Sequence, residues 1–85
     1  MNQKYDDAVV KCFLEHQLQL FPEEVAQTPE EAREFLEEVF AQVASSKKEV
    51  IRFFEDGGID FDAKTILDEA EVFDVGDGRF LIVEG

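Results

Sequence analysis

Cys12 and His16 are the residues whose types could perform covalent chemistry. They lie four positions apart, so a helix would place them side by side on one face. A thiolate beside an imidazole can act as a nucleophile with its base, or supply two ligands to a metal ion. The same helical arc is centred on Val9, Phe13 and Leu20, and a buried cysteine behaves as a small apolar residue. Because there is no second cysteine or histidine to complete a zinc site, we interpret the pair as a core cysteine beside a boundary histidine.

A second group of residues has the spacing of a calcium-binding loop. Counted from the first member, four acidic residues take positions 1, 3, 9 and 12: Asp60, Asp62, Asp68 and Glu71. The fifth position, where a ligand belongs, is Lys64, and the sixth, where such a loop needs glycine, is Thr65. The alternative is that Asp62 caps a helix and the other acids are solvated. We expect no bound metal and no other cofactor.

The stretch Thr28–Ala44 is predicted to be a helix. Five glutamates recur on its polar side: Glu30, Glu31, Glu34, Glu37 and Glu38. They form either a solvated outer face or a docking surface for a basic protein. Acid–base catalysis by such a pair of carboxylates would need a concave and partly dry site to shift one pKa, which an exposed helix face does not provide. We therefore predict no catalytic residue here.

The net charge limits the class of partner. The chain of 85 residues carries 8 basic and 21 acidic side chains, a formal charge of −13. Such a field repels nucleic acid and anionic membranes and favours a basic protein partner. No apolar run exceeds four residues, and the N-terminal residues lack the apolar segment of a signal peptide. We expect a single domain over residues 1–85, no membrane contact and a cytoplasmic location.

Apolar periodicity predicts the elements that position these residues. Three stretches have the repeat of amphipathic helices: Tyr5–Leu20, Thr28–Ala44 and Ser46–Gly57. The second and third each begin with a capping box, in which Thr28 or Ser46 is followed three residues later by a glutamate. A short fourth helix from Asp62 to Ala70 is a further option.

The C-terminal segment predicts a β-hairpin, because apolar residues flank Gly76-Asp77-Gly78 on both sides. A two-residue turn would pair Phe73 with Ile82, whereas a three-residue turn with a bulge at Gly78 would pair Phe73 with Leu81. Phe80–Val83 is four apolar residues in a row, so both faces of this strand need cover. The helices can cover one face, and the fourth helix, the N-terminal segment or a second protomer the other. We favour cover within the chain, and therefore a monomer over a homodimer.

Three segments carry a resemblance to a known group of proteins: KYDDAVVKCFLEHQLQLFPE, TPEEAREFLEE and EVFDVGDGRFLIVEG. Together they resemble a small family of acidic bacterial proteins without an established activity, some of which carry a glyoxalase label. The resemblance implies a compact, free-standing domain. A glyoxalase-type metal centre draws on several histidine and glutamate ligands, whereas this chain has one histidine.

The sequence thus predicts an α+β fold with three main α-helices and a C-terminal two-stranded antiparallel β-hairpin. The function that it favours is a non-enzymatic interaction or regulatory module for a basic protein, acting through the five glutamates. Two alternatives stay open. One is a subunit or remnant of a glyoxalase-type metal-dependent lyase, and the other is an acidic inhibitor or immunity-type protein that masks a basic partner.

Overall fold

The computed structural model of the chain describes residues 5–83, in which helices and short strands alternate. The α-helices are α1 (Asp7–His16), α2 (Pro29–Glu38) and α3 (Lys47–Asp56). The strands are β1 (Gln42–Ala44), β2 (Val72–Asp74) and β3 (Phe80–Ile82). Two 3-10 helices accompany them, η1 (Gln17–Gln19) and η2 (Ile66–Asp68). The predicted α+β class is confirmed, and no helix within residues 5–83 is long and apolar enough to cross a membrane.

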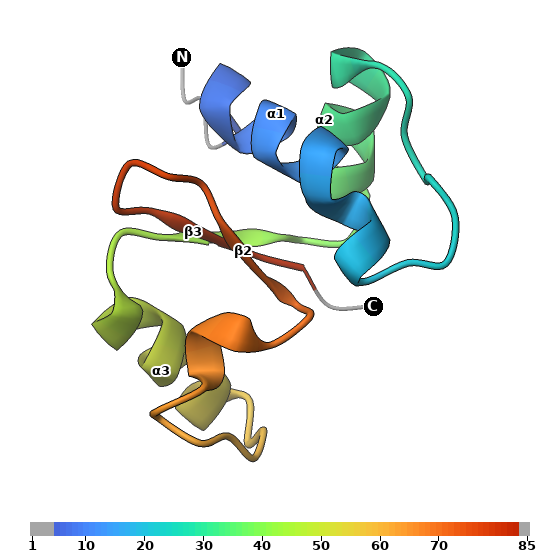
Figure 1. The fold of residues 1–85 in the computed structure, drawn as a ribbon. Helices are drawn as coiled ribbons and strands as arrows, with labels where there is room; N and C mark the ends of the chain where they lie inside the picture. The colour runs from blue at the N-terminus through green and yellow to red at the C-terminus, as the bar shows by residue number, and fades with distance from the viewer. Residues whose placement is uncertain (1–4, 84–85) are drawn as a thin grey trace.

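The three strands form one antiparallel sheet in the order β1-β3-β2. Figure 1 shows α1 and α2 together on one side of this sheet, with α3 and η2 on the other side. The prediction of a C-terminal two-stranded hairpin as the whole sheet was therefore wrong: β2 and β3 do pair, but β1 adds a third strand on the far side of β3. A central strand needs a hydrogen-bonding neighbour on each edge, and β1 supplies the second one.

The central strand β3 explains how four consecutive apolar residues are covered. Leu81 and Val83 are fully buried in a core beneath α1 and α2, together with Phe13. Ile82 points into a second core with Val50, on the side of α3 and η2. Both faces of the strand are thus covered by elements of the same chain, which is the arrangement that the sequence favoured.

Phe13 lies at the centre of the first core and has no exposed surface. Its ring centroid is 5.5 Å from that of Phe35 on α2, 5.6 Å from that of Phe73 on β2 and 6.4 Å from that of Phe21. Aromatic contacts at such distances add to the free energy gained by burial. Phe13 therefore joins both helices of the upper layer to the sheet.

The first helix is shorter than its apolar pattern predicted. It begins at Asp7, where the Asp6 carboxylate accepts the N–H of Val9 at 3.1 Å, and its regular part ends at His16. The chain then tightens into η1, because Gln17 turns its amide into the interior and binds the following loop. The apolar residues beyond His16 belong to this tighter turn and to the loop.

The second helix was also predicted too long. It ends at Glu38, and the residues expected in its last turn become β1. The reversal occurs at Phe40, whose φ of 56° is incompatible with a continuing right-handed helix. Because Gln42 and Ala44 pair with Ile82 and Phe80, this segment gains the edge of β3 in place of further helical hydrogen bonds.

The remaining expectations concern the turn and the fourth helix. Phe73 pairs with Leu81, so the three-residue turn with positive φ at Gly78 is the register that forms.

The segment after Asp62 makes only the single 3-10 turn η2 and no fourth α-helix. Asp62 accepts the N–H of Lys64 at 2.9 Å, so it caps a turn instead of a helix.

Candidate functional site

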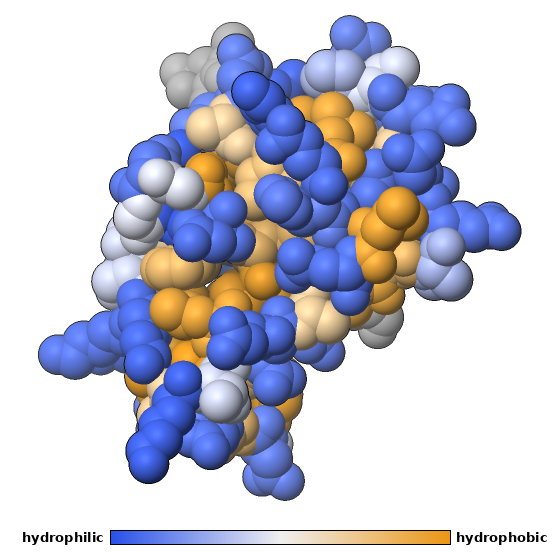
Figure 2. All heavy atoms as spheres, viewed as in Figure 1, coloured by the Kyte–Doolittle hydropathy of each residue, from blue (hydrophilic) through white to orange (hydrophobic). Residues whose placement is uncertain are grey.

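The predicted acidic face occupies the outer side of α2. All of its members are exposed to solvent: Glu30, Glu31, Glu34, Glu37 and Glu38. The inner side of the helix buries Ala32 and Leu36 against the first core. Figure 2 shows that hydrophilic residues cover most of one face of the molecule, with apolar patches between them. The five carboxylates are thus presented to solvent by a firmly packed helix.

Glu31 has a structural role within this face. Its carboxylate accepts the N–H of Gln27 at 2.9 Å, while the Thr28 hydroxyl accepts the N–H of Glu31 at 3.2 Å. The bond from Thr28 is the one that the predicted capping box requires, whereas the Glu31 carboxylate reaches one residue further back than the cap. Glu31 is therefore partly committed to the start of α2, and the other four glutamates carry the charge that a partner could meet.

Arg33 is the one cation among the residues of α2, and it is turned toward α1. Its Nε donates to the carbonyl of Tyr5 at 3.2 Å, and its Nη2 lies 3.6 Å from the carboxylate of Asp7. The arginine therefore fastens α2 to the beginning of α1. The outer carboxylates of α2 are left without a compensating charge from their own helix.

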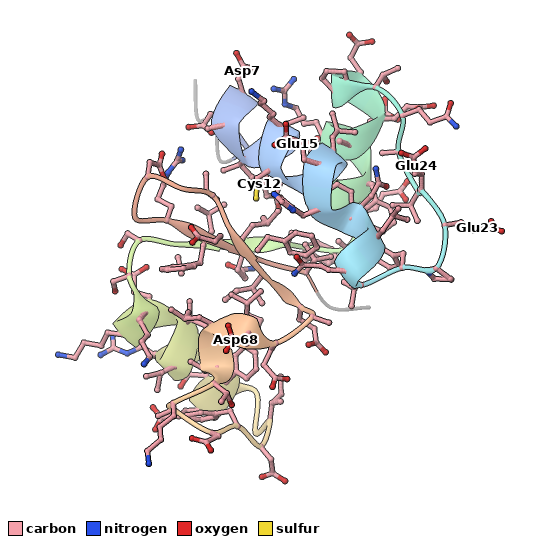
Figure 3. All side chains as sticks on the ribbon, viewed as in Figure 1. Asp7, Cys12, Glu15, Glu23, Glu24 and Asp68 are labelled. Atoms are coloured by element: carbon pink, nitrogen blue, oxygen red, sulfur yellow. The ribbon has the colours of Figure 1, made fainter. Side chains whose placement is uncertain are left out.

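Cys12 is buried and is poorly suited to act as a nucleophile. Figure 3 shows it on the side of α1 that faces the sheet, and its thiol donates to the carbonyl of Asp74 at 3.3 Å. Burial, with smaller effects of the negative charges of Asp74 and Glu15, raises the pKa of the thiol to about 11. His16 is exposed at the end of the helix and shares no hydrogen bond with the sulfur among the described residues. The pair thus has the arrangement of a core cysteine beside a surface histidine.

The acidic residues that have the spacing of a calcium-binding loop do not converge. Asp60, Asp62 and Asp68 are exposed, and the Asp62 carboxylate caps its own turn. Within residues 5–83 no three histidine, cysteine, aspartate or glutamate side chains gather in a way that could hold a metal ion. The calcium loop is therefore not formed, and the described residues also provide no ligand set for a glyoxalase-type centre.

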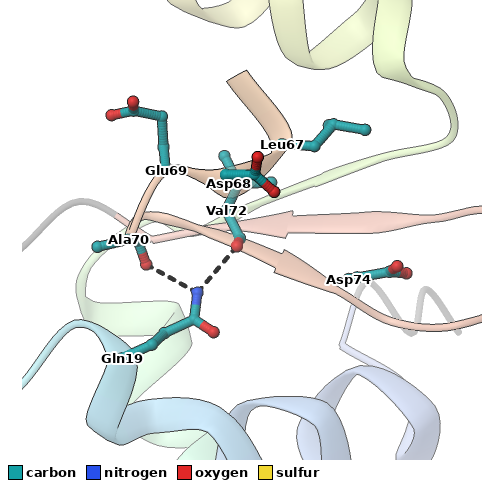
Figure 4. A pocket seen from close by; sticks show the side chains of 7 residues that line it. All are labelled: Gln19, Leu67, Asp68, Glu69, Ala70, Val72 and Asp74. Atoms are coloured by element: carbon teal, nitrogen blue, oxygen red, sulfur yellow. Dashed lines mark hydrogen bonds between the residues drawn. The ribbon is translucent and has the colours of Figure 1, made fainter. Parts of the chain in front are cut away.

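A shallow depression of about 390 Å³ lies beside the outer edge of β2. Figure 4 shows Gln19 reaching from η1 to this edge, where its Nε2 donates to the carbonyls of Ala70 and Val72 at 3.0 and 2.9 Å. The carboxylates around it come from Asp68 and Asp74, with Glu69 nearby. Sequence reasoning missed Gln19, because a glutamine in an amphipathic stretch carries no signal of the strand that it will contact.

The chain matches no protein-family model, no curated protein and no solved structure in the comparisons made with each. What defines the protein is therefore its own fold and surface. It is a small acidic α+β protein with a three-stranded sheet between two helical layers. Its most strongly charged helix, α2, has no cation of its own on its outer side.

Proposed function

We propose that this protein is a non-enzymatic interaction or regulatory module that binds a basic protein partner through the acidic face of α2. Four glutamates contribute directly: Glu30, Glu34, Glu37 and Glu38. Complementary charge across an interface speeds the encounter of two proteins and fixes their orientation. With a net charge of −13, the chain as a whole would attract the same kind of partner.

The observation that supports this proposal most is the position of Arg33. A lone arginine among glutamates on an exposed helix would ordinarily pair with those one turn away. Here its guanidinium binds the Tyr5 carbonyl and approaches Asp7, both outside α2. The negative charge on the outer side of the helix is therefore available to a cation from another molecule.

The experiment compares two triple variants that change the net charge equally. Glu34, Glu37 and Glu38 are changed to lysine in one, and Glu15, Glu23 and Glu24 in the other. All six side chains are exposed, and Figure 3 shows that Glu15 lies on α1 and that Glu23 and Glu24 lie on the loop before α2. The tagged wild-type protein is used to recover partners from a host lysate at low and moderate salt, and the recovered protein is then purified for titration.

The α2 variant should bind that purified partner about tenfold or more weakly, because three favourable charge pairs become repulsive. The control variant should bind nearly as well as the wild type. Equal weakening in both variants would mean that only the net charge matters and that α2 is not the contact surface. Recovery of no basic partner at either salt concentration would count against the proposal as a whole.

The activity of the recovered partner separates an adaptor from an inhibitor. An acidic inhibitor covers the basic site of an enzyme, so the enzyme would lose activity in the complex, and the binding would weaken steeply with salt. A partner that keeps its activity indicates a regulatory or scaffolding contact. Both outcomes use the same surface of α2.

A further inference from the structure

Phe40 is the most exposed large apolar side chain among residues 5–83. Its exposed fraction is 80%, compared with 60% for Leu18. It follows the last turn of α2 and belongs to neither of the two apolar cores. A phenylalanine in such a position contributes little to folding by burial and is available to another molecule.

The backbone at Phe40 has the left-handed conformation that usually calls for glycine. The N–H of Ala41 donates to the carbonyl of Leu36 at 3.0 Å, and the N–H of Phe40 donates to that of Glu37 at 3.3 Å. These bonds define a Schellman motif, whose residue after the cap adopts positive φ, here 56°. Glycine reaches this conformation at no steric cost, whereas a bulky side chain is strained there. The chain therefore carries an exposed aromatic residue where glycine would make the fold more stable.

The two edge strands of the sheet differ in whether their outward backbone groups have hydrogen-bond partners. The outward carbonyls of β2 are capped by α1 and η1, since Gln19 binds Val72 and Cys12 binds Asp74. On the opposite edge, Val43 lies across from Leu81 of β3. Arg79 and Val83 make their backbone hydrogen bonds to the β2 side, so by alternation Leu81 does too, and the N–H and C=O of Val43 point away from the sheet. No side chain of residues 5–83 caps either group of Val43.

The open part of β1 is short and well defined. Before it, the carbonyl of Ala41 accepts the Tyr5 hydroxyl at 2.6 Å, and after it, the N–H of Ser45 donates to Glu49 at 2.9 Å. An added strand would therefore pair mainly with Val43. Flanking bonds of this kind leave room for a short peptide segment and not for a long continuous ladder.

A groove of about 290 Å³ continues this surface between β1 and α3. Its apolar wall includes Ala44, Phe53 and Ile82. Its charged lining residues are Asp56, Arg52 and Glu49, and the Glu49 carboxylate already accepts hydrogen bonds from Ser45. Side chains of an added strand alternate between the two faces of the sheet, so every second one would lie over this groove.

We propose that Phe40, the open edge at Val43 and this groove bind an extended basic segment of a partner protein as an additional strand on β1. Phe40 would be the aromatic anchor. The exposed carboxylates of Glu37 and Glu38, which precede it in the sequence, and that of Asp56 in the groove would pair with lysine or arginine residues of the segment. A second copy of this chain is a poor occupant, because each copy carries a charge of −13. The inference rests on the basic partner of the proposed function and adds where and how that partner binds.

The probe is a phage-displayed library of random twelve-residue peptides, selected on the wild-type protein at low salt. Enriched peptides should combine lysine or arginine with apolar residues at alternating positions. Amide resonances shifted by a synthetic copy of the best peptide should be centred on Phe40 and Val43. Failure to enrich basic peptides, or shifts centred elsewhere, would overturn the inference.

Two variants test the anchor. Phe40→Gly should raise the melting temperature by roughly 4 °C, because it removes the strain, and should weaken peptide binding at least tenfold. Leu18→Ala, which also removes an exposed apolar side chain, should change the affinity less than twofold. A Phe40→Gly variant that binds as well as the wild type would contradict the role of Phe40. If the variant loses binding while its melting temperature rises as expected, misfolding is ruled out as the reason for the loss.

Methylation of the peptide tests the strand. A copy N-methylated at the residue that would pair with Val43 cannot donate a hydrogen bond and should bind at least tenfold more weakly, whereas methylation of the next residue should matter less. Equal effects at both positions would exclude strand addition. If neither Phe40 nor methylation matters while the lysine variant of α2 still loses its partner, this inference fails and the proposed function remains.

Discussion

Arg79 fastens the tip of the β2–β3 hairpin to the beginning of α1 by binding Asp6. Its Nη1 donates to the Asp6 carboxylate at 2.9 Å, and its Nε and Nη2 bind Asp77 within the turn at 3.0 and 2.7 Å. Asp6 also caps α1 by accepting the N–H of Val9. The Asp6 carboxylate therefore binds both the start of α1 and Arg79 of the hairpin, a residue 73 positions away in the sequence.

Replacing Arg79 with methionine should lower the free energy of unfolding by up to about 1 kcal/mol, because the guanidinium and its partners are partly exposed. Arg52→Met is the matched control, since Arg52 is exposed and forms no salt bridge with the described residues. Urea unfolding at neutral pH measures both. A larger loss for the Arg52 variant would contradict this role of Arg79.

The same contact predicts how stability depends on pH. The hydrogen bond from Arg79, followed by that from Val9, lowers the pKa of Asp6 below its ordinary value of 3.8. A lowered pKa in the folded state stabilises the protein above the unfolded value, and this contribution is lost as the pH falls through the folded value. The difference in stability between wild type and Arg79→Met should therefore narrow below about pH 3.8. NMR titration of the Asp6 carboxyl should show its pKa rising in the variant, and an unchanged pKa would contradict the assignment.

Cys12 should react slowly with aromatic disulfide reagents in the folded protein. A pKa of about 11 in place of 9.0 reduces the thiolate fraction at neutral pH about 100-fold, and burial slows access further. The thiol should react rapidly once urea unfolds the chain. Immediate and complete reaction of the native protein would mean that the sulfur is not buried. The interpretation of Cys12 as a core residue beside a surface histidine would then be wrong.

The local signals in the sequence predicted the starts of α2 and α3 and the hairpin turn well. Thr28 and Ser46 accept the N–H groups of Glu31 and Glu49, as capping boxes require. The turn at Gly78 has the positive φ that its residue type allows. Such features depend on residues within one turn of each other, so the sequence contains all the information that they need.

The strand β1 could not be predicted in the same way. Its three residues carry no alternating pattern of their own, and Val39 and Val43 continue the spacing of the preceding helix. The residue after the cap of this helix is Phe40, where glycine would have given a signal. The strand forms because the outer edge of β3 needs a partner, and that requirement lies about 40 positions away in the chain.

The surface was only partly visible from the sequence. The five glutamates of α2 were identified, but the orientation of Arg33 toward Tyr5 depends on how α1 and α2 pack. The exposure of Phe40 was also hidden, since it falls on the apolar stripe of the predicted helix. Periodicity assigns an apolar residue to the core whenever the helix is assumed to continue.

The two apolar cores lie on opposite faces of the sheet, so changes in them should act independently. Leu36→Ala creates a cavity in the first core and should cost about 2–5 kcal/mol, while Ile66→Val in the second should cost about 0.5–1.5 kcal/mol. The double variant should lose the sum within about 0.5 kcal/mol. The comparison is the double variant Phe13→Leu with Leu36→Ala. Both residues lie in the first core, so their losses in the free energy of unfolding should not add. A large coupling between Leu36 and Ile66 would show that the sheet transmits strain between its faces.

Gln17 is the one polar side chain that is buried among the described residues, and it holds the loop between η1 and α2 in place. Its Oε1 accepts the N–H groups of Val25 and Ala26 at 2.7 and 3.1 Å, and its Nε2 donates to the carbonyl of Ala26 at 2.9 Å. Gln17→Met keeps the volume but leaves these backbone groups without partners, which should cost about 2–3 kcal/mol.

Gln19→Met is the matched control for that change, because Gln19 is exposed, its bond to the Ala70 carbonyl is exposed and its bond to the Val72 carbonyl is only partly buried. It should cost less than about 1 kcal/mol. The two variants should also differ in local opening. A protease that cleaves after glutamate should cut at Glu23 and Glu24 faster in Gln17→Met than in Gln19→Met, since only the first loses the bonds that hold this loop. Equal stability losses and equal cleavage rates would show that the loop is held by its apolar contacts and not by the Gln17 amide.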